Sequence, residues 1–314
     1  MQIILASAKI MNVSIKREQS KLVCSVEREK RGMKSNDRSA TKGDACQSKK
    51  VKSSPDISLT SPRFQNEADR FAKDMAQYSA ETIAEMLGCS QQIAAQNRLR
   101  YMRFFDDGAK LPAILAYHGQ AYKHLKAETL NVDDLNYSQE KLWITSFLYG
   151  LLRPLDAILP YRMEGNVELP SGEGQNMFGF WKSRLTDVLI DSVKADGGIL
   201  VHLATEEYQH LFDWHRVRKE VRVVQPLFYV RKGSELKILA VRAKTCRGAM
   251  TRFIIENRMT NQSSDLQFAS RSIFWNYMET HLPIVMRRTA TFCGHRKINS
   301  RTARSKGSKP KGKS

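Results

Sequence analysis

The chain has 314 residues with a 41% hydrophobic share, 9% aromatics and a formal net charge of +19, which allows one large domain or two ordinary ones. No run of about 18 uncharged apolar residues occurs, so we expect no membrane span, and the N-terminus lacks the layout of a signal peptide. Five scattered cysteines without a C-x-x-C motif argue against a secreted disulfide framework and favour a cytosolic protein with reduced thiols.

The positive charge is concentrated in two segments. Residues 13–54 hold 12 Lys and Arg against 5 Asp and Glu, and residues 268–314 hold 11 against 1. Both segments are poor in large apolar side chains that could offset the entropy of ordering, so we predict a disordered basic insertion and a disordered basic tail. Residues 1–12 and 55–267 then form one core. The chain outside 13–54 and 268–314 is nearly neutral, with 28 Lys and Arg against 26 Asp and Glu, so overall charge is weak support for nucleic-acid binding.

The N-terminal half predicts a strand, three helices and a second strand. Residues 2–6 are a short apolar run that ends at the turn Ser7-Ala8-Lys9. Helical spacing of apolar residues predicts helices over 64–78, from the N-cap Ser79 onward, and over 90–104. The apolar run 113–117 predicts a buried strand followed by a helical turn up to Leu125.

The middle of the chain predicts a helix-hairpin-helix-like layout. We expect a helix over 138–149 with Ser138 as its N-cap and Gly150 just past its end, then a short helix between Pro154 and Pro160. Backbone N–H groups near Gly150 and the side chain of Arg153 could then contact a phosphate. The alternative is an ordinary C-capped helix in which Arg153 pairs with a carboxylate such as Asp156.

The C-terminal half predicts more strand. We expect a helix over 178–193, strands over 199–204, 222–230 and 235–244, and a helix over 245–257, the last two strands forming a hairpin across 231–234. Helices and strands mix without strict alternation, which is typical of a single compact α+β or irregular α/β domain.

Four cations lie on and just after the last predicted strand. They are Lys244, Arg247, Arg252 and Arg258, and Gly248 beside them would allow a close approach. Such crowding suits an anionic ligand. The alternative is a solvated helix face that pairs with Glu256.

Other candidate chemistry is weak. Ser7 and Lys9 could form a nucleophile-with-lysine pair. Glu206 and Glu207 follow a predicted strand, where they could carry chemistry or simply begin the next helix. Histidine spacing predicts no metal site, and we expect no cofactor because phosphate-loop and dinucleotide-binding motifs are absent from the sequence.

Several strings, taken together, resemble the YaaA family of bacterial peroxide-stress proteins. They keep their order over residues 1–11 and about 61–265, and the most specific are Ile4-Leu5-Ala6-Ser7-Ala8-Lys9, Leu148-Tyr149-Gly150-Leu151-Leu152-Arg153-Pro154-Leu155-Asp156, Glu207-Tyr208 and Met250-Thr251-Arg252-Phe253-Ile254-Ile255-Glu256-Asn257-Arg258. This chain departs from the family in the insertion 13–54, in the sequence after about Asp265, and at Ala8, where family members have proline.

The resemblance implies a cytosolic protein that limits free iron under peroxide stress. It also implies a compact mixed α/β fold with a helix-hairpin-helix element and a positively charged cleft that binds duplex DNA. The resemblance does not establish any catalytic reaction. We therefore expect phosphate contacts at Gly150 and Arg153 and a basic cleft lined by Lys9, Lys244, Arg247, Arg252 and Arg258. The alternative is an enzyme acting on a phosphorylated or nucleotide-like small molecule, with Lys9 and Glu207 in the chemistry. Direct iron binding would need ligands that the sequence does not show.

Overall fold

A five-stranded sheet forms the centre of the computed structural model, which describes residues 1–12, 58–106, 108, 110–232, 235–260 and 284–288. Its strands lie in the order β4-β3-β1-β6-β7. They are β1 (Gln2–Ala6), β3 (Leu142–Ser146), β4 (Gly150–Leu152), β6 (Ile199–His202) and β7 (Arg222–Val224). All neighbours are parallel except β3 and β4. Ile4 pairs with Trp143 on one side and with His202 on the other, so β1 lies at the middle of the sheet.

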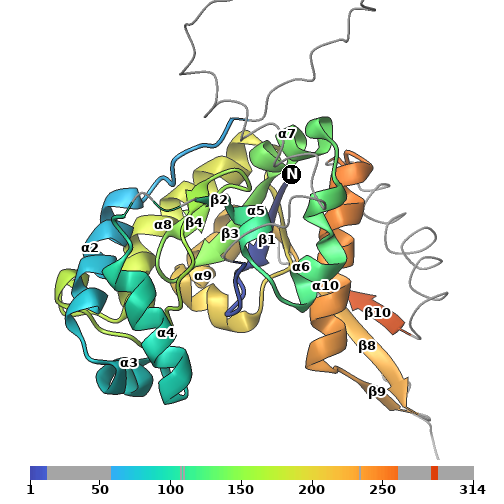
Figure 1. The fold of residues 1–314 in the computed structure, drawn as a ribbon. Coiled ribbons are helices and arrows are strands. Elements are labelled where there is room, and N and C mark those ends of the chain that lie inside the picture. The colour runs from blue at the N-terminus through green and yellow to red at the C-terminus, as the bar shows by residue number, and fades with distance from the viewer. Residues whose placement is uncertain (13–57, 107, 109, 233–234, 261–283, 289–314) are drawn as a thin grey trace, which may run out of the picture.

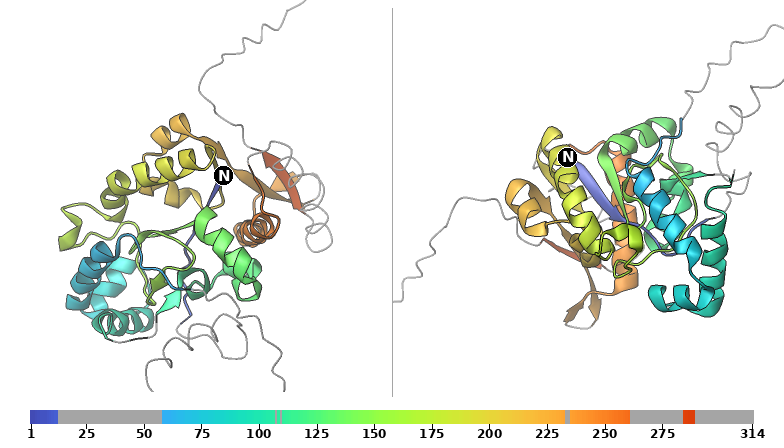
Figure 2. Two further views of the ribbon diagram at one scale, coloured as in Figure 1. Left: turned by 90° about the horizontal axis from the view of Figure 1, so that it is seen from above. Right: turned by 90° about the vertical axis from the view of Figure 1, so that its left-hand side faces the viewer.

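Helices cover the sheet from both sides, which makes this a mixed α/β domain. Helix α8 (Met177–Ala195) lies on one side, and α6 (Gln120–Leu125), α7 (Val132–Lys141) and α10 (Ala240–Glu256) lie on the other (Figure 1). Three helices, α2 (Gln65–Gln77), α3 (Ala80–Leu87) and α4 (Gln91–Met102), form a group at one edge, which Figure 2 shows from two further directions. The core continues between this group and α8.

The sequence predicted these helices where capping and periodicity agree. Ser79 accepts a hydrogen bond from the Thr82 amide at the start of α3, and Gly88 ends that helix with a φ of 53°. Phe71 of α2 is buried and packs edge-on against Phe180 of α8, with ring centroids 4.9 Å apart. The predicted strand over 2–6 is confirmed as β1. The predicted helices over 64–78, 90–104 and 178–193 are confirmed, within a few residues, as α2, α4 and α8.

The predicted helix over 138–149 is wrong. Helix α7 begins after Asn131, whose side chain forms a capping box with Asp134, and it ends at Lys141. The fully buried residues 142–146 then form β3, which pairs with β4. A strand that is buried on both faces of a sheet does not alternate apolar with polar residues, so its continuous apolar run also matches a helical pattern. Consequently the structure shows a β-hairpin in place of the expected helix-hairpin-helix layout around Gly150.

Three further elements differ from the prediction. Residues 113–116 form the short helix α5 (Ala113–Ala116), and the expected helix after Pro154 is the strand β5 (Ala157–Ile158), which pairs with β2 (Leu111–Pro112). The hairpin across 231–234 is confirmed as β8 (Pro226–Lys232) and β9 (Glu235–Lys237), but helix α10 begins at Ala240, so Lys244 is helical.

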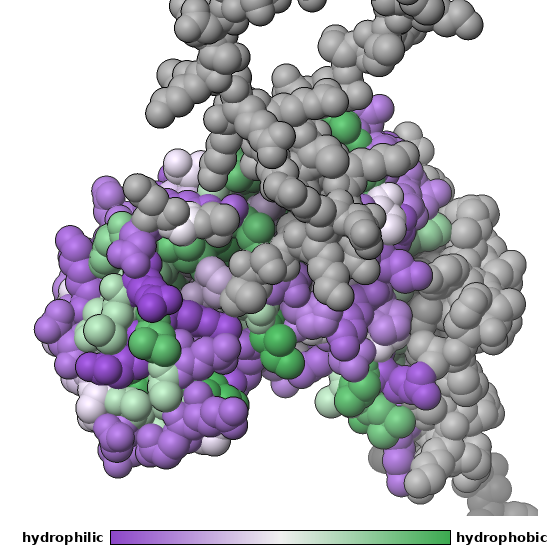
Figure 3. All heavy atoms as spheres, viewed as in Figure 1, coloured by the Kyte–Doolittle hydropathy of each residue, from purple (hydrophilic) through white to green (hydrophobic). Residues whose placement is uncertain are grey.

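The two basic segments fall mostly outside the described residues. The insertion 13–54 lies wholly outside them. In the tail, Ile284–Arg288 form β10, which pairs antiparallel with β8, so this part of the predicted disordered tail is a strand. Figure 3 shows that hydrophobic residues gather at the start of α10 near β9 on a mainly hydrophilic face, and Ile238, Leu239 and Val241 are exposed in this part of the chain.

Candidate functional site

A pocket of about 330 Å³ opens where the central strands β1 and β6 end. Leu5 and Ala6 are the last residues of β1 and residues 7–10 follow it, whereas Leu203, Thr205, Glu207 and Tyr208 follow β6. Its remaining wall comes from residues 118–122 around the start of α6 and from Lys244 and Arg247 of α10. Of the expected cleft residues, the pocket therefore brings together Lys9, Lys244 and Arg247.

This position follows from the chain topology. The chain passes from β1 to β3 on one side and later crosses from β4 to β6 on the other side. The carboxyl ends of β1 and β6 therefore flank a point where the direction of winding reverses. In open α/β sheets, ligands bind in the crevice at such a switch point.

Gly248 brings the two cations of α10 to the pocket. A Cβ atom at this position would fall on the backbone carbonyl of Ala121 in α6, far inside contact distance, so only glycine permits the observed helix packing. Lys244 and Arg247 lie three residues apart and face the same pocket. The close approach at Gly248 is that of the α6 backbone, which occupies the space beside this glycine.

Arg247 carries a half-buried charge at the pocket wall. Burial lowers the pKa of its guanidinium, and the nearby Glu206 partly opposes that shift. Within the part of the chain that the structure describes, the Arg247 side chain has no hydrogen bond or ion pair. A buried cation without a partner is costly unless a ligand supplies the opposite charge.

Lys9 lines the pocket and forms an ion pair with Glu164. Its Nζ lies 2.7 Å from Oε2 of Glu164, whose other carboxylate oxygen lies 3.1 Å from Nη2 of Arg162. The Lys9 side chain is 55% exposed, whereas that of Glu164 is only 14% exposed. Sequence reasoning missed Glu164.

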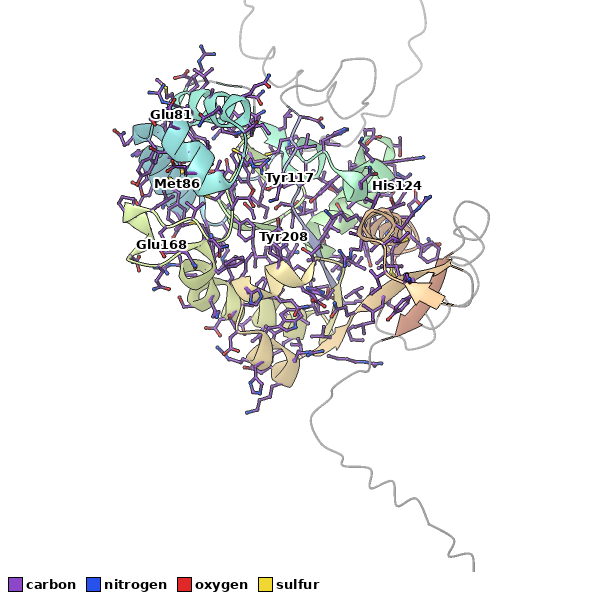
Figure 4. The ribbon with its side chains drawn as sticks, turned by 90° about the horizontal axis from the view of Figure 1, so that it is seen from below. Glu81, Met86, Tyr117, His124, Glu168 and Tyr208 are labelled. Carbon is purple, nitrogen blue, oxygen red and sulfur yellow. The ribbon has the colours of Figure 1, made fainter. Side chains whose placement is uncertain are left out.

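Neutral hydroxyl groups form the inner wall. Ser7 Oγ lies 3.0 Å from Tyr208 Oη, and Tyr122 donates a hydrogen bond of 3.0 Å to the carbonyl oxygen of Ala6. Burial raises the pKa of Tyr122 and Tyr208, so both phenols stay protonated at neutral pH. Figure 4 shows Tyr208 and Tyr117 near the middle of the molecule.

Behind this wall lies a buried hydroxyl cluster centred on Tyr161. The Tyr161 oxygen lies 2.6 Å from Ser146 Oγ and 2.8 Å from Tyr117 Oη. Burial raises the pKa of Tyr161 to about 12, and hydrogen bonds from Ser146, Tyr117 and Ser7 oppose that rise. These contacts satisfy polar groups in the core and fix the floor beneath Ser7.

Arg153 lies away from the pocket and is engaged within the protein. Its guanidinium stacks 3.3 Å from the ring centroid of Trp143. It donates hydrogen bonds to Gln2 Oε1 and to the carbonyl oxygens of Glu140 and Leu142, each 3.1–3.2 Å long. The expected pairing with Asp156 takes another form, because Asp156 accepts from the backbone amide of Arg153. Gly150, with φ 68°, packs against Trp181.

Arg252 and Arg258 are also engaged elsewhere. Arg252 donates to the carbonyl oxygens of Leu125 and Lys126 at the end of α6 and pairs with Glu256 at 2.6 Å. Arg258 pairs with Asp134 of α7 at 2.7 Å. The structure therefore does not bring Arg153, Arg252 or Arg258 into the pocket.

His202 makes the fold sensitive to acid. Its imidazole is 2% exposed, and burial, with the charges of Arg247 and Arg218, lowers its pKa to about 3. Below pH 6.5 the unfolded chain binds a proton that the folded chain excludes, so we expect stability to fall as the pH drops from about 6.5 to about 3. At pH 5 the expected loss is about 2 kcal/mol relative to pH 7.

Urea unfolding at pH 7 and pH 5 measures this loss. His202→Gln should remove it, whereas His215→Gln, at an exposed position, should retain it. An unchanged pH dependence in His202→Gln would contradict the assignment.

The fold and the pocket together define a mixed α/β protein with a pocket at a strand switch point. Among the described residues no helix is long and apolar enough to cross a membrane. Within the same residues no group of three or more His, Cys, Asp and Glu side chains is placed to hold a metal ion.

A family model described as peroxide stress protein YaaA matches residues 1–275, and the chain belongs to this family. The chain is 49% identical over 203 residues to a UPF0246 protein of Phocaeicola vulgatus, covering 64% of this chain and 80% of that one. It is 43% identical over 218 residues to a UPF0246 protein of Bacteroides fragilis, covering 69% and 85%. A third relative, from Porphyromonas gingivalis, is 42% identical over 204 residues, covering 64% and 80%.

Proposed function

We propose that this peroxide stress protein acts by binding the phosphate group of a phosphorylated or nucleotide-like small molecule in the pocket. The observation that carries the proposal is Arg247, a half-buried guanidinium that forms no hydrogen bond or ion pair among the described residues. A phosphate would supply the missing charge and accept bidentate hydrogen bonds from the guanidinium. Lys244 adds a second cation from the same helix face.

The size and place of the pocket support a small ligand. Its volume of about 330 Å³ is at the lower end of the range for small-molecule sites. Strand-end switch points are also where α/β proteins bind cofactors and small substrates.

Duplex DNA is the second candidate. The observation that favours it is the exposure of Lys9 and Lys244 at the pocket mouth, where they could contact a phosphate backbone. Two observations weaken this candidate. Arg153, Arg252 and Arg258 are engaged in intramolecular contacts, and a β-hairpin takes the place of the expected helix-hairpin-helix layout.

Arg247→Ala tests the proposal. We expect it to weaken binding of a mononucleotide about 100-fold, because the charge-assisted hydrogen bonds are lost. We expect little change in melting temperature, since Arg247 has no protein partner among the described residues. Arg242→Ala is the matched control, because Arg242 is an exposed cation of α10 outside the pocket lining. Calorimetric titration of the full chain measures both variants.

A competition titration separates the two candidates. Labelled duplex DNA that binds and is not displaced by excess mononucleotide would favour the DNA candidate. If neither ligand binds, both candidates fail. The proposal also includes a cytosolic location and the limitation of free iron. Under peroxide, cells that carry Arg247→Ala should therefore show a raised level of free iron by electron paramagnetic resonance. Cells that carry Arg242→Ala should not.

A further inference from the structure

Glu207 is an acid in a pocket with a basic wall. It lines the pocket together with Lys244 and Arg247, and its side chain is exposed. Within the described part of the chain its carboxylate has no hydrogen bond or ion pair, even though Lys9, Lys244 and Arg247 line the same pocket. A carboxylate accepts hydrogen bonds and donates none. The pocket therefore presents donors from α10 on one wall and an unused acceptor from Glu206–Leu211 (η3) on the other.

We propose that the ligand is a phosphorylated sugar, free or within a mononucleotide, whose hydroxyl groups donate hydrogen bonds to Glu207. This inference rests on the proposed function, since it assigns the phosphate of the same molecule to Arg247. Glu207 is then a residue that sets specificity. The anionic group of such a ligand would pair with the cations of α10, and its hydroxyl groups would donate to Glu207. A cationic donor could also pair with Glu207, but it would lie beside the cations of α10 and be repelled by them.

Other phosphate-bearing ligands fit the pocket less well. Phosphodiesters of duplex DNA and inorganic phosphate at high pH have few or no donors for Glu207, and its negative charge repels them. Ser7 and Tyr208 share one hydrogen bond at the inner wall, and their neutral hydroxyl oxygens are weaker acceptors than a carboxylate. The carboxylate of Glu207 is therefore the strongest free acceptor among the described lining residues.

Calorimetric titration of the full chain with four probes tests the inference. The probes are ribose 5-phosphate, adenosine 5′-monophosphate, ethyl phosphate and inorganic phosphate. We expect ribose 5-phosphate to bind about tenfold more tightly than ethyl phosphate, the gain typical of a hydrogen bond to a charged group. A further gain for adenosine 5′-monophosphate would identify the source as a mononucleotide, and no gain would identify a free sugar phosphate.

Two variants separate recognition from a structural role. Glu207→Gln should abolish the advantage of ribose 5-phosphate over ethyl phosphate while leaving inorganic phosphate binding equal or slightly tighter. Glu206→Gln removes the same charge next to Glu207 but outside the pocket lining, so it should preserve that advantage.

Three outcomes would overturn the inference. The first is that Glu207→Gln weakens the binding of all four probes equally, and the second is that ribose 5-phosphate binds the native chain no more tightly than ethyl phosphate. In either case Glu207 does not recognise sugar hydroxyl groups, although the phosphate proposal stands. If none of the probes binds the native chain, both the inference and the proposed function fail.

Discussion

Gly248→Ala is expected to lower the free energy of unfolding by about 3 kcal/mol or more. The added methyl group would overlap the backbone carbonyl of Ala121, and no side-chain rotation can relieve a clash with backbone. Helices α6 and α10 would have to separate, which would also move Lys244 and Arg247 away from the pocket. Thermal and urea unfolding measure the loss, and ligand titration at a temperature where the variant is folded measures the displacement of the cations.

Gly172→Ala is the matched control. A methyl group there would meet the Met177 side chain at 3.7 Å, which is an ordinary contact, and the backbone of Gly172 does not have a positive φ. We expect this variant to melt within a few degrees of the native chain. Equal melting temperatures for Gly248→Ala and Gly172→Ala would show that the two helices can part without cost.

Arg153→Ala is expected to cost about 3 kcal/mol of stability with no direct effect on phosphate binding. Truncation removes the stacking on Trp143 and leaves the carbonyl oxygens of Glu140 and Leu142 without their donor. The guanidinium connects the end of α7 with the start of β3 by hydrogen bonds, so its loss should destabilise the part of the sheet that pairs with β1. Urea unfolding gives the stability, and titration with a mononucleotide gives the binding.

Arg153→Lys separates the two roles that the sequence left open. Lysine keeps the charge but cannot form the planar fork or the stacked arrangement, so we expect it to recover little of the lost stability. A phosphate contact, by contrast, would tolerate lysine. Asp156→Ala should not rescue Arg153→Ala, because the Asp156 carboxylate contacts the backbone amide of Arg153 and the Thr60 hydroxyl rather than the guanidinium. Rescue, or normal stability with lost binding, would contradict this assignment.

The fold was predictable from the sequence where one local signal dominated. The amphipathic spacing of α2 and the serine cap of α3 were sufficient, because each helix buries only one face. Leu142–Ser146 was misassigned because all five residues are buried, so neither period stood out. The capping box of Asn131 and Asp134 could have corrected this error, since it places the N-cap of α7 seven residues before Ser138.

The candidate site was predictable only in part. Lys244 and Arg247 were selected because they lie close together among cations in the sequence, and Lys9 was added to the cleft through the family resemblance. Arg252 and Arg258 were grouped with them because sequence shows closeness along the chain but not the direction of each side chain. Arg252 instead turns to the end of α6 and Arg258 to α7. Glu164 was missed because its contact with Lys9 joins residues far apart in the chain.

The central position of β1 has a consequence for how the chain acquires its structure. Ile4 lies far ahead in the chain of its two neighbours in the sheet, Trp143 and His202, so most of the core separates it from them in sequence. Pairings of such long sequence separation form late and slow folding. We therefore expect the strand to dock last, into a slot between β3 and β6, so that the pocket is completed in the final step of folding.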